Sequence, residues 1–244
     1  MHTIDNTELT VSLSTLKAVA THAAKQDIRY YLNGVCFNPR AGNGNAGLIM
    51  ATDGHRLIVC EGMTVTGYST PRPCPAFILD NDSVAAIISA HKGMPKKANP
   101  DVTFIYKQTA DGNVKHVPEI AVKTPIGVLT FKPVDGVFPD VSRVIPKSHD
   151  IREQNEPGFY NNSYVNEAIK AIELFTESKL SYSWPIFQRG QSASGLMRAE
   201  NNAGHRLLIV IMPIRVAVDD LDPAIICGVV DGIHGQLSQV NCEK

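Results

Sequence analysis

The sequence predicts an α+β fold in which a few helices lie on one face of antiparallel sheets. Strand-like runs outnumber helical ones, and only three segments space their apolar residues three and four positions apart. A short strand, a helix and several strands follow one another three times, at intervals of roughly 70 residues. No sequence identity links the three passes, so the predicted repeat is one of architecture.

The composition is that of an ordinary soluble globular protein. The 244 residues are 43% hydrophobic and 19% charged, which suits one to two domains with a proper core. The longest apolar run, residues 207–214, is far shorter than the ~20 residues that cross a bilayer, and the chain starts with polar residues. We therefore expect a cytoplasmic protein with no membrane partner. The formal net charge of −1 argues against nucleic-acid binding over the whole surface but leaves a local basic face open.

The strands are predicted from alternating or β-branched runs bounded by turn residues. These runs lie at residues 10–13, 28–37, 48–52, 56–60, 77–79, 102–106, 120–123, 128–131, 180–184, 196–199 and 207–215. The helices are expected near residues 14–26, 81–92 and 163–175. Asp80 is an expected N-cap and Gly93 an expected stop for the second helix, while residues 161–163 offer caps for the third.

Residues 42–47, GNGNAG, fit a glycine pattern that cradles dinucleotides. That function needs a helix directly after the glycines, because the helix N-terminus must meet the pyrophosphate. Here the glycines are followed by LIMATDGHRLIVC, which is strand-like. We therefore interpret the segment as a hairpin loop in which glycine and asparagine supply positive φ angles.

The residues that can carry chemistry do not form a recognisable catalytic pattern. The five cysteines are widely spaced without a C-x-x-C pair, so neither a zinc site nor a disulfide framework is indicated. Asp53 and His55 could serve as acid and base, but no nucleophile or third metal ligand accompanies them. Tyr182 and Trp184 are expected in sheet packing. The sequence therefore predicts no enzyme, no metal and no cofactor.

Five stretches of the chain match, in order, segments of one known family. They are QDIRYYLNGVCF (26–37), MATDGHRLIVC (50–60), VDGVFPDVSRVIPK (134–147), EPGFYNNSYVNEAIKAI (156–172) and LLIVIMPIRV (207–216). The first three resemble the middle domain of the bacterial DNA polymerase III β subunit, the sliding clamp. The last two resemble the last helix and the C-terminal strand of that family's third domain, where the M-P-x-R ending is distinctive.

The resemblance divides the chain into three parts. Residues 1–148 would form a clamp domain of two strand–helix–strand repeats, like the family's middle domain. Residues 149–216 would form a partial domain, like the second half of the C-terminal domain, and 217–244 an extension. The family's N-terminal domain is expected to be missing, so that one chain would carry three repeats.

What the resemblance implies is a DNA clamp, or processivity fold, in which helices line a central hole and duplex DNA passes without sequence readout. On the first helix Lys17, Thr21 and Lys25 fall at four-residue spacing, and further lysines cluster at the end of the second. Such lysines can neutralise phosphates, although a solvated helix face is the simpler alternative. The residues expected to face DNA are Lys17, Lys25, Gln26, Tyr30, Lys92, Lys96 and Lys97.

The family also docks linear peptides of DNA polymerases, the clamp loader and repair proteins in a hydrophobic pocket between its second and third domains. Carried over to this chain, the pocket residues are Arg29, Tyr31, Thr52, Gly54, His55, Arg56, Leu57, Pro139, Arg143, Val144, Tyr164, Val210, Met212, Pro213, Ile214 and Arg215. Methionine and the aliphatic side chains suit a peptide's apolar anchors, while Arg56, Arg143 and His55 suit its backbone or a glutamine. Alternatively, Leu57, Val144 and Val210 are ordinary core residues.

Two functions follow from the resemblance. The first is a minimal clamp that closes a ring as a homo-oligomer and tethers a DNA polymerase to double-stranded DNA. The second is a peptide-binding module that forms no ring and acts as a decoy or regulator of clamp partners. Within the extension, Gln236-Leu237-Ser238 loosely resembles the start of a clamp-binding peptide, so a self-docking tail is a further hypothesis.

Overall fold

The computed structural model describes residues 4–41, 45–68, 74–95, 99–109, 118–147, 158–179, 185–188, 190, 192–215 and 230. The chain divides into two compact units, Met1–Pro213 and Ile214–Lys244. In the second unit, only Ile214, Arg215 and Val230 are described. Every helix and strand named below belongs to the first unit.

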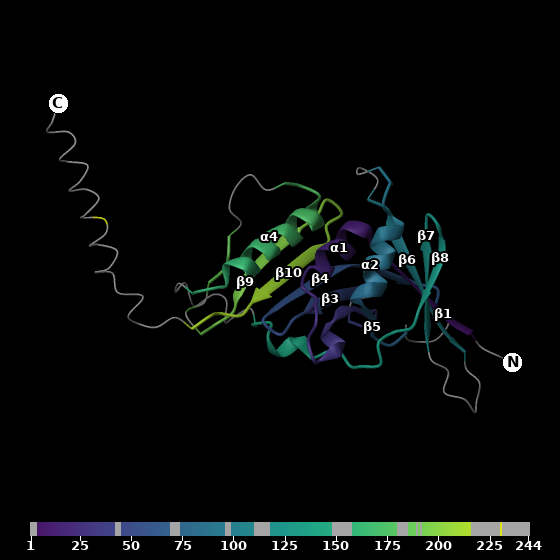
Figure 1. The fold of residues 1–244 in the computed structure, drawn as a ribbon, viewed down its shortest axis with the longest axis horizontal. Helices are drawn as coiled ribbons and strands as arrows, with labels where there is room; N and C mark the ends of the chain where they lie inside the picture. The colour runs from purple at the N-terminus through teal and green to yellow at the C-terminus, as the bar shows by residue number, and fades with distance from the viewer. Residues whose placement is uncertain are drawn as a thin grey trace. The chain divides into compact units, whose positions relative to one another are not determined.

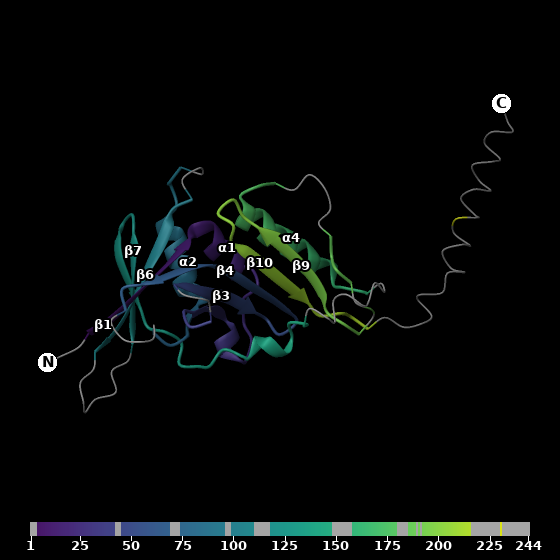
Figure 2. The same ribbon diagram turned by 180° about the vertical axis from the view of Figure 1, so that it is seen from behind.

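A ten-stranded sheet forms the framework of the first unit, and its paired strands run antiparallel (Figures 1 and 2). The main path runs β5-β2-β3-β4-β1-β6-β7-β8, and β10 and then β9 branch from β4. The strands are β1 (Ile4–Ser12), β2 (Gly34–Asn38), β3 (Ala46–Thr52), β4 (Arg56–Thr66), β5 (Phe77–Asp80), β6 (Asp101–Thr109), β7 (Glu119–Thr124), β8 (Gly127–Phe131), β9 (Gly195–Glu200) and β10 (Arg206–Ile211).

Strand β4 pairs with β3 along one edge, and its other edge is shared by two further ladders, which joins the third repeat to the first. The beginning of β4 pairs with β10, from Arg56 opposite Ile211 to Cys60 opposite Leu207, whereas its end pairs with β1. The branch occurs around Gly62, whose φ of 119° is open to glycine alone without strain. Residues 56–60 and 207–211 are thereby held side by side, although about 150 positions separate them in the chain.

Three helices lie together on one side of the sheet (Figure 1). They are α1 (Leu13–Ala20), α2 (Asn81–Ala90) and α4 (Asn162–Thr176), and α1 packs against both of the others. The predicted caps are present: Asp80 accepts a hydrogen bond from the backbone N–H of Ser83 at 2.7 Å, and Asn161 accepts one from that of Ser163 at 2.9 Å. The predicted α+β class, with helices on one face of antiparallel sheets, is confirmed.

The core lies between these helices and the sheet. Phe37 stacks on Phe77 with ring centroids 5.1 Å apart and contacts Phe104 at 4.7 Å. From α4, Ala171, Ile172 and Phe175 join the same buried cluster as the residues of α1 and β4. The three repeats therefore share one core.

Two predicted elements end differently in the structure. The helix expected to reach residue 26 stops at Ala20, because the Thr21 hydroxyl donates to the carbonyl of Ala18 at 2.7 Å and the chain then turns away. The strand expected from residue 28 begins only at Gly34 and is preceded by a 3-10 turn, η1 (Tyr30–Leu32). The Asn33 side chain causes this turn by exchanging two hydrogen bonds with the backbone of Asp27, at 2.8 and 2.9 Å.

Further sequence predictions concern the last strand, the glycine-rich segment and residues outside the described ranges. The last strand ends at Ile211, just before Pro213, instead of continuing to residue 215. The glycine-rich segment leads into β3, which begins at Ala46, so no helix follows the glycines and a dinucleotide site is excluded. Residues 42–44, the strand expected at 180–184 with Tyr182 and Trp184, and the extension from 217 except Val230 lie outside the described residues.

Candidate functional site

A cavity of about 160 Å³ lies where β4, β10 and the segment after β8 meet. That segment ends in a second 3-10 turn, η2 (Val141–Arg143). The cavity is lined by Arg29, Leu32, Thr52, Gly54, Arg56, Leu57, Pro139, Asp140, Val141, Val144, Val210 and Met212. Residues from all three predicted groups, around 29–57, 139–144 and 210–212, therefore surround one hollow.

The floor of the cavity is aliphatic. Leu57 and Val210 face each other across the β4–β10 pair and are 2% and 0% exposed. They form a buried cluster with Leu196, and Val141 and Val144 pack against it from η2. The same side chains therefore pack in the core and line the cavity.

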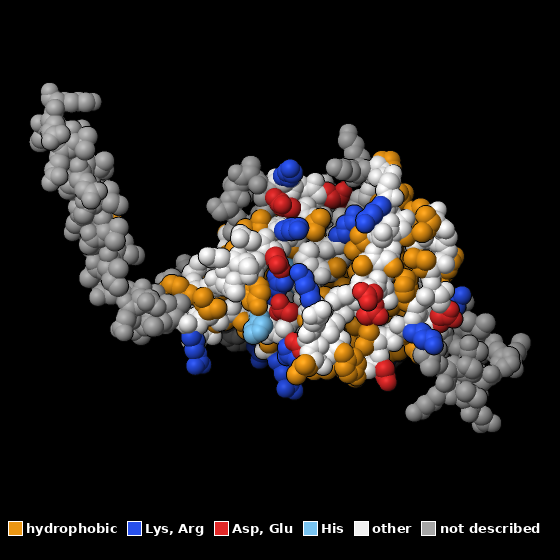
Figure 3. Space-filling model, in the orientation of Figure 1, with side chains coloured by type: hydrophobic (Ala, Val, Ile, Leu, Met, Phe, Trp, Pro, Cys, Tyr) orange, Lys and Arg blue, Asp and Glu red, His pale blue; other side chains and the backbone are white. Residues whose placement is uncertain are grey.

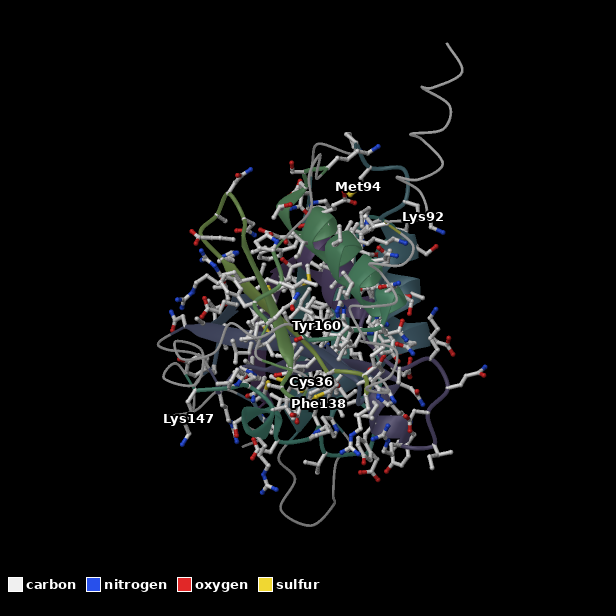
Figure 4. All side chains as sticks on the ribbon, turned by 90° about the vertical axis from the view of Figure 1, so that its left-hand side faces the viewer. Cys36, Lys92, Met94, Phe138, Lys147 and Tyr160 are labelled. Atoms are coloured by element: carbon white, nitrogen blue, oxygen red, sulfur yellow. The ribbon has the colours of Figure 1, made fainter. Side chains whose placement is uncertain are left out.

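The segment that covers this part of the sheet is anchored by Phe138. Its ring packs against a separate small cluster of Cys36, Met50 and Ile78, and the N–H of Val134 bonds to the carbonyl of Ile78 at 2.9 Å. Figure 4 shows Cys36 and Phe138 next to each other in the lower part of the molecule. This packing holds η2 at the cavity wall.

The turn from Thr52 to Arg56 is built by its own side chains. One carboxylate oxygen of Asp53 accepts from the backbone N–H groups of His55 and Arg56, at 2.9 and 3.0 Å. The Thr52 hydroxyl donates to the Arg56 carbonyl at 2.7 Å and accepts from the N–H of Gly54 at 3.1 Å. Gly54 has a φ of 90°, as expected for the turn residue. Asp53 is therefore a structural residue of this turn.

Arg56 ties the turn to two helices. Its side chain is only 6% exposed, and its Nε lies 3.0 Å from the second carboxylate oxygen of Asp53. An Nη atom donates to the carbonyl of Thr21 at 3.2 Å, just past α1, and the guanidinium forms an ion pair with Glu167 of α4. The guanidinium carbon also lies 4.8 Å from the centre of the Tyr164 ring. The charge of Arg56 is thus engaged within the chain.

His22 is buried close to this network. Its side chain is 0% exposed, and its Nδ1 lies 2.8 Å from the hydroxyl of Thr21. Burial, and secondarily the positive charge of Arg56, lower the pKa of His22 to about 3. The imidazole is therefore neutral at physiological pH.

Arg29 forms the charged lip of the cavity. Its guanidinium binds both carboxylate oxygens of Asp27, at 2.9 and 2.6 Å, and lies over Gly54 so closely that a Cβ there would be 2.9 Å from Nη2. The hydrogen bonds from Arg29 lower the pKa of Asp27 to about 2, and the pKa of Arg29 is raised in return. Asp27 therefore holds a half-exposed positive charge over the turn.

Five predicted pocket residues of the first unit do not line the cavity: Tyr31, His55, Arg143, Tyr164 and Pro213. Tyr31 packs against the Cys36 cluster, and Pro213 follows Met212 at the end of the unit. His55 is exposed, and its ring stacks on Tyr164 with the centroids 6.2 Å apart.

Arg143 is 84% exposed and lies 3.4 Å from the carboxylate of Asp140. Ile214 and Arg215 belong to the second compact unit. Leu32, Asp140 and Val141 line the cavity and were not predicted. The signal for them was their position inside the matched stretches 26–37 and 134–147.

A second hollowed surface is the helix face. One groove of about 800 Å³ is lined by four lysines. Lys17 lies on α1 and Lys170 on α4, whereas Lys92 and Lys179 follow the ends of α2 and α4. A neighbouring hollow of about 470 Å³ is lined by Lys25 and again by Lys170. Figure 3 shows blue side chains spread over this face with red ones between them. Sequence reasoning missed Lys170 and Lys179, because it treated α4 only as a source of pocket residues.

The other residues expected to face DNA are placed elsewhere or not described. Tyr30 donates its hydroxyl to the carbonyl of Asp135 at 2.7 Å, and Gln26 is exposed, but neither lines these two grooves. Lys96 and Lys97 lie outside the described residues. In Figure 4, Lys92 and Met94 lie near the top of the molecule, well away from Cys36 and Phe138. The groove and the cavity share no lining residue.

The described residues contain no cluster of three or more His, Cys, Asp or Glu side chains with the geometry to bind a metal ion. Within the same part of the chain, no helix has the length and apolar character needed to cross a membrane.

Comparisons with known proteins agree with the fold. No protein-family profile matches the chain. Curated β sliding clamps do: that of Escherichia coli K12 is 29% identical over 184 residues, covering 72% of this chain and 44% of that protein. That of Pseudomonas aeruginosa PAO1 is 31% identical over 191 residues, covering 75% and 46%. The chain thus spans about half the length of the curated relatives it matches.

Solved structures give the same answer for the fold. A sliding clamp of P. aeruginosa aligns with a TM-score of 0.58 at 17% identity, covering 86% of this chain and 66% of the other. The DNA polymerase III β subunit of Thermotoga maritima aligns with a TM-score of 0.56 at 18% identity, with the same coverage. The fold is therefore that of the DNA clamps. The chain's relatives in sequence are the bacterial β sliding clamps, so the resemblance inferred from the motifs is confirmed.

Proposed function

We propose that this chain is a sliding-clamp-like processivity factor of DNA replication that docks a linear peptide of a polymerase, a clamp loader or a repair protein in the cavity beside β10. The observation that carries this proposal is the meeting of residues 29–57, 139–144 and 210–212 around one hollow with an aliphatic floor. A small apolar hollow with few polar groups suits an aliphatic or aromatic anchor of a peptide.

The lip of the cavity suits the polar part of such a peptide. Arg29 is fixed by Asp27 and presents donors beside Gly54, where a glutamine side chain or a backbone carbonyl can accept. Arg56 does not fit that role, because its side chain is only 6% exposed and its guanidinium contacts Asp53, the Thr21 carbonyl and Glu167 within the chain. Its buried Nη1 is paired with Glu167 by charge but makes no well-directed hydrogen bond. In this proposal Arg29 binds the guest, and Arg56 positions the turn.

The proposal extends to duplex DNA through the helix face. Lys17, Lys25, Lys92 and Lys170 lie along two adjoining grooves on the side opposite the sheet's exposed face. Phosphate contacts from lysines confer no sequence preference and are weakened by salt, as a protein that slides requires. In an oligomer that surrounds DNA, these helices would face the duplex.

A specific observation supports the alternative, a peptide-binding module that does not encircle DNA. The accessible side of α4 and its end carry Glu167, Glu173 and Glu177 together with Lys170. Carboxylates among lysines reduce the attraction for phosphates. In this alternative the cavity binds a peptide, but the protein does not encircle DNA and is not retained on a closed circle.

The test is peptide binding measured by fluorescence anisotropy, with a short labelled peptide that carries glutamine, leucine and phenylalanine. We expect the full chain to bind it, and Val144→Ala combined with Met212→Ala to weaken binding at least tenfold, about 1.4 kcal/mol. Val137→Ala is the matched control, because Val137 is 86% exposed and does not line the cavity. Equal affinities for the double variant and the wild type would remove the docking proposal.

A second measurement separates the two functions. The protein is mixed with nicked circular DNA, and the sample is passed over a size-exclusion column before and after the DNA is linearised. Retention on the circle and loss from the linear form support a ring, whereas peptide binding without retention supports the module.

A further inference from the structure

The groove on the helix face that contains Lys17 and Lys170 has the size of a small-molecule site. Pockets for cofactors and other small ligands enclose roughly 300–1,000 Å³, and the volume of this groove is about 800 Å³. Its walls are α1, α4 and the segment that follows α2, and all of its lining residues belong to the first unit. The class of ligand that fits the groove can therefore be inferred from these side chains.

The lining of the groove carries an excess of positive charge. None of its four lysines forms an ion pair with a described residue. Two glutamates, Glu173 and Glu177, also line the groove, which leaves two positive charges in excess. The carboxylate of Glu177 accepts a hydrogen bond from the side-chain amide of Asn99. The groove therefore favours an anionic ligand.

His91, at the end of α2, adds a buried hydrogen-bonding group to the groove wall. Its side chain is 5% exposed and lines the groove. Nδ1 lies 2.8 Å from the carbonyl oxygen of Ile87, and because a carbonyl only accepts, Nδ1 carries the hydrogen. In the neutral ring Nε2 is then an acceptor; it is not fully enclosed, and no described residue donates to it. A ligand that presents an N–H group would complete the hydrogen bonding of His91.

Apolar side chains complete the lining. Met94 and Pro95 follow His91 closely in the chain, and Leu13 and Leu174 come from α1 and α4. Leu174 also packs against the core, whereas Met94 is 37% exposed. Because methionine is flexible and polarisable, it adapts to the face of a flat ring. The groove thus offers cations, one buried acceptor and an apolar surface.

We propose that the groove binds a free nucleoside phosphate whose base carries an amino group. The phosphates lie among the lysines, the base contacts Met94 and Leu174, and its amino group donates to Nε2 of His91. The phosphates of a duplex would use only the lysines. The inference goes beyond the proposed function and is independent of the peptide cavity. A bound nucleotide would compete with duplex DNA for Lys17 and Lys170.

Isothermal titration calorimetry of the full chain tests the proposal with ATP, purine riboside triphosphate and inorganic tripolyphosphate. Purine riboside triphosphate lacks the amino group, and tripolyphosphate lacks the base as well. We expect ATP to bind most tightly and His91→Leu to weaken ATP binding about tenfold, the effect of losing one buried hydrogen-bond partner. The same variant should bind tripolyphosphate like the wild type. His91→Gln, whose amide oxygen can accept, should retain more of the affinity for ATP.

Charge variants and DNA controls complete the test. Lys170→Glu should weaken the binding of all three ligands, whereas Lys123→Glu, at an exposed lysine that lines neither groove, should not. Circular dichroism and urea unfolding verify that each variant is folded. If His91→Leu does not fold, the comparison of ATP with purine riboside triphosphate on the wild type decides the role of the amino group.

Equal affinities for ATP and tripolyphosphate, or a folded His91→Leu variant that binds ATP like the wild type, would overturn the proposal. Duplex DNA binding is measured separately, so that a chain that binds the duplex but not ATP refutes the nucleotide site alone. A blunt DNA hairpin is also compared with one that carries unpaired adenosines. Tighter binding of the second hairpin that depends on His91 would assign the groove to a strand end and would overturn a free nucleotide as its ligand.

Discussion

Arg56 at the start of β4 forms an ion pair with Glu167 of α4, and this contact joins the first repeat to the third. The arginine is 6% exposed and the glutamate 42%, so the pair is protected on one side only. Arg56 also forms an ion pair with Asp53 and donates a hydrogen bond to the carbonyl of Thr21. It therefore stabilises both the wall of the cavity and the junction of the helices.

Arg56→Ala is expected to lower the free energy of unfolding by on the order of 3 kcal/mol, because it leaves the carboxylate of Asp53 without its buried partner. Glu167→Gln should cost less, since Glu167 is partly exposed. Urea denaturation measures both. The control is Arg206→Ala, which removes an exposed ion pair with Glu61 and should cost much less. If Arg56→Ala and Arg206→Ala lower the free energy of unfolding equally, Arg56 does not stabilise the junction between the turn and the helices.

Gly54→Ala should weaken peptide binding more than it weakens the fold. A Cβ at Gly54 would lie 2.9 Å from Nη2 of Arg29, and the φ of 90° adds strain of about 1–2 kcal/mol. Gly204→Ala is matched to it, because Gly204 also has a positive φ, 76°, but has nothing within 4 Å of the new methyl group. We expect similar losses in urea unfolding and a loss of peptide affinity for Gly54→Ala alone. Unchanged affinity in both would show that Arg29 does not contact the guest.

Acid should destabilise the protein through His22. Its folded-state pKa of about 3 lies below the ordinary value of 6.5, so only the unfolded chain takes up the proton between these values. The stability that neutral His22 provides is complete above pH 6.5 and is lost as the pH falls from there toward 3, with a slope approaching about 1.4 kcal/mol per pH unit. Unfolding curves at several pH values should show this slope in the wild type and a shallower one in His22→Gln. His55→Gln, at an exposed histidine, is the control.

Asp27 also makes the protein less stable in acid, but over a lower pH range than His22. Its pKa is lowered from 3.8 to about 2, so the contribution of its contact with Arg29 is present above pH 3.8 and is lost as the pH falls through 2. Asp27→Asn should therefore change peptide affinity at neutral pH by releasing Arg29 from its position. A peptide titration of Asp27→Asn that matches the wild type would contradict the positioning role.

Lys170→Glu should weaken binding to duplex DNA as strongly as Lys17→Glu. Both lysines line the same groove on the helix face, and each phosphate contact that is lost reduces the slope of log affinity against log salt concentration by about 1. Lys123→Glu on β7 is the control, because Lys123 is exposed but lines neither groove. Identical salt slopes for the three variants would place DNA somewhere else.

Much of the fold could be predicted because its signals are local. Asp80 and Asn161 cap their helices through bonds within three residues, and the strands follow from alternation. The errors are local too. Ala23 and Ala24 continue the apolar pattern of α1 and are buried, but the chain has already left the helix at Thr21. A buried alanine looks the same in a helix and in a turn, so the pattern alone does not mark this end.

The candidate site could be predicted only in part, because its walls meet through the pairing of β4 with β10. Periodicity carries no information on which of two distant strands pair, and the motif resemblance supplied that link. It did not reveal that Arg56 points inward, since this depends on how closely α4 approaches the turn. Nor did it reveal Lys170, whose relevance depends on α1 and α4 sharing one groove.

The division of β4 between two ladders has a consequence for cooperativity. Opening the β4–β10 pair exposes Ile58, Cys60 and Ile209, all 0% exposed, so the last repeat cannot peel away while the rest stays native. Amide hydrogens on β4 should consequently exchange with solvent only in the global opening that also releases those of β10, and a fragment ending before α4 should not hold its remaining sheet in place.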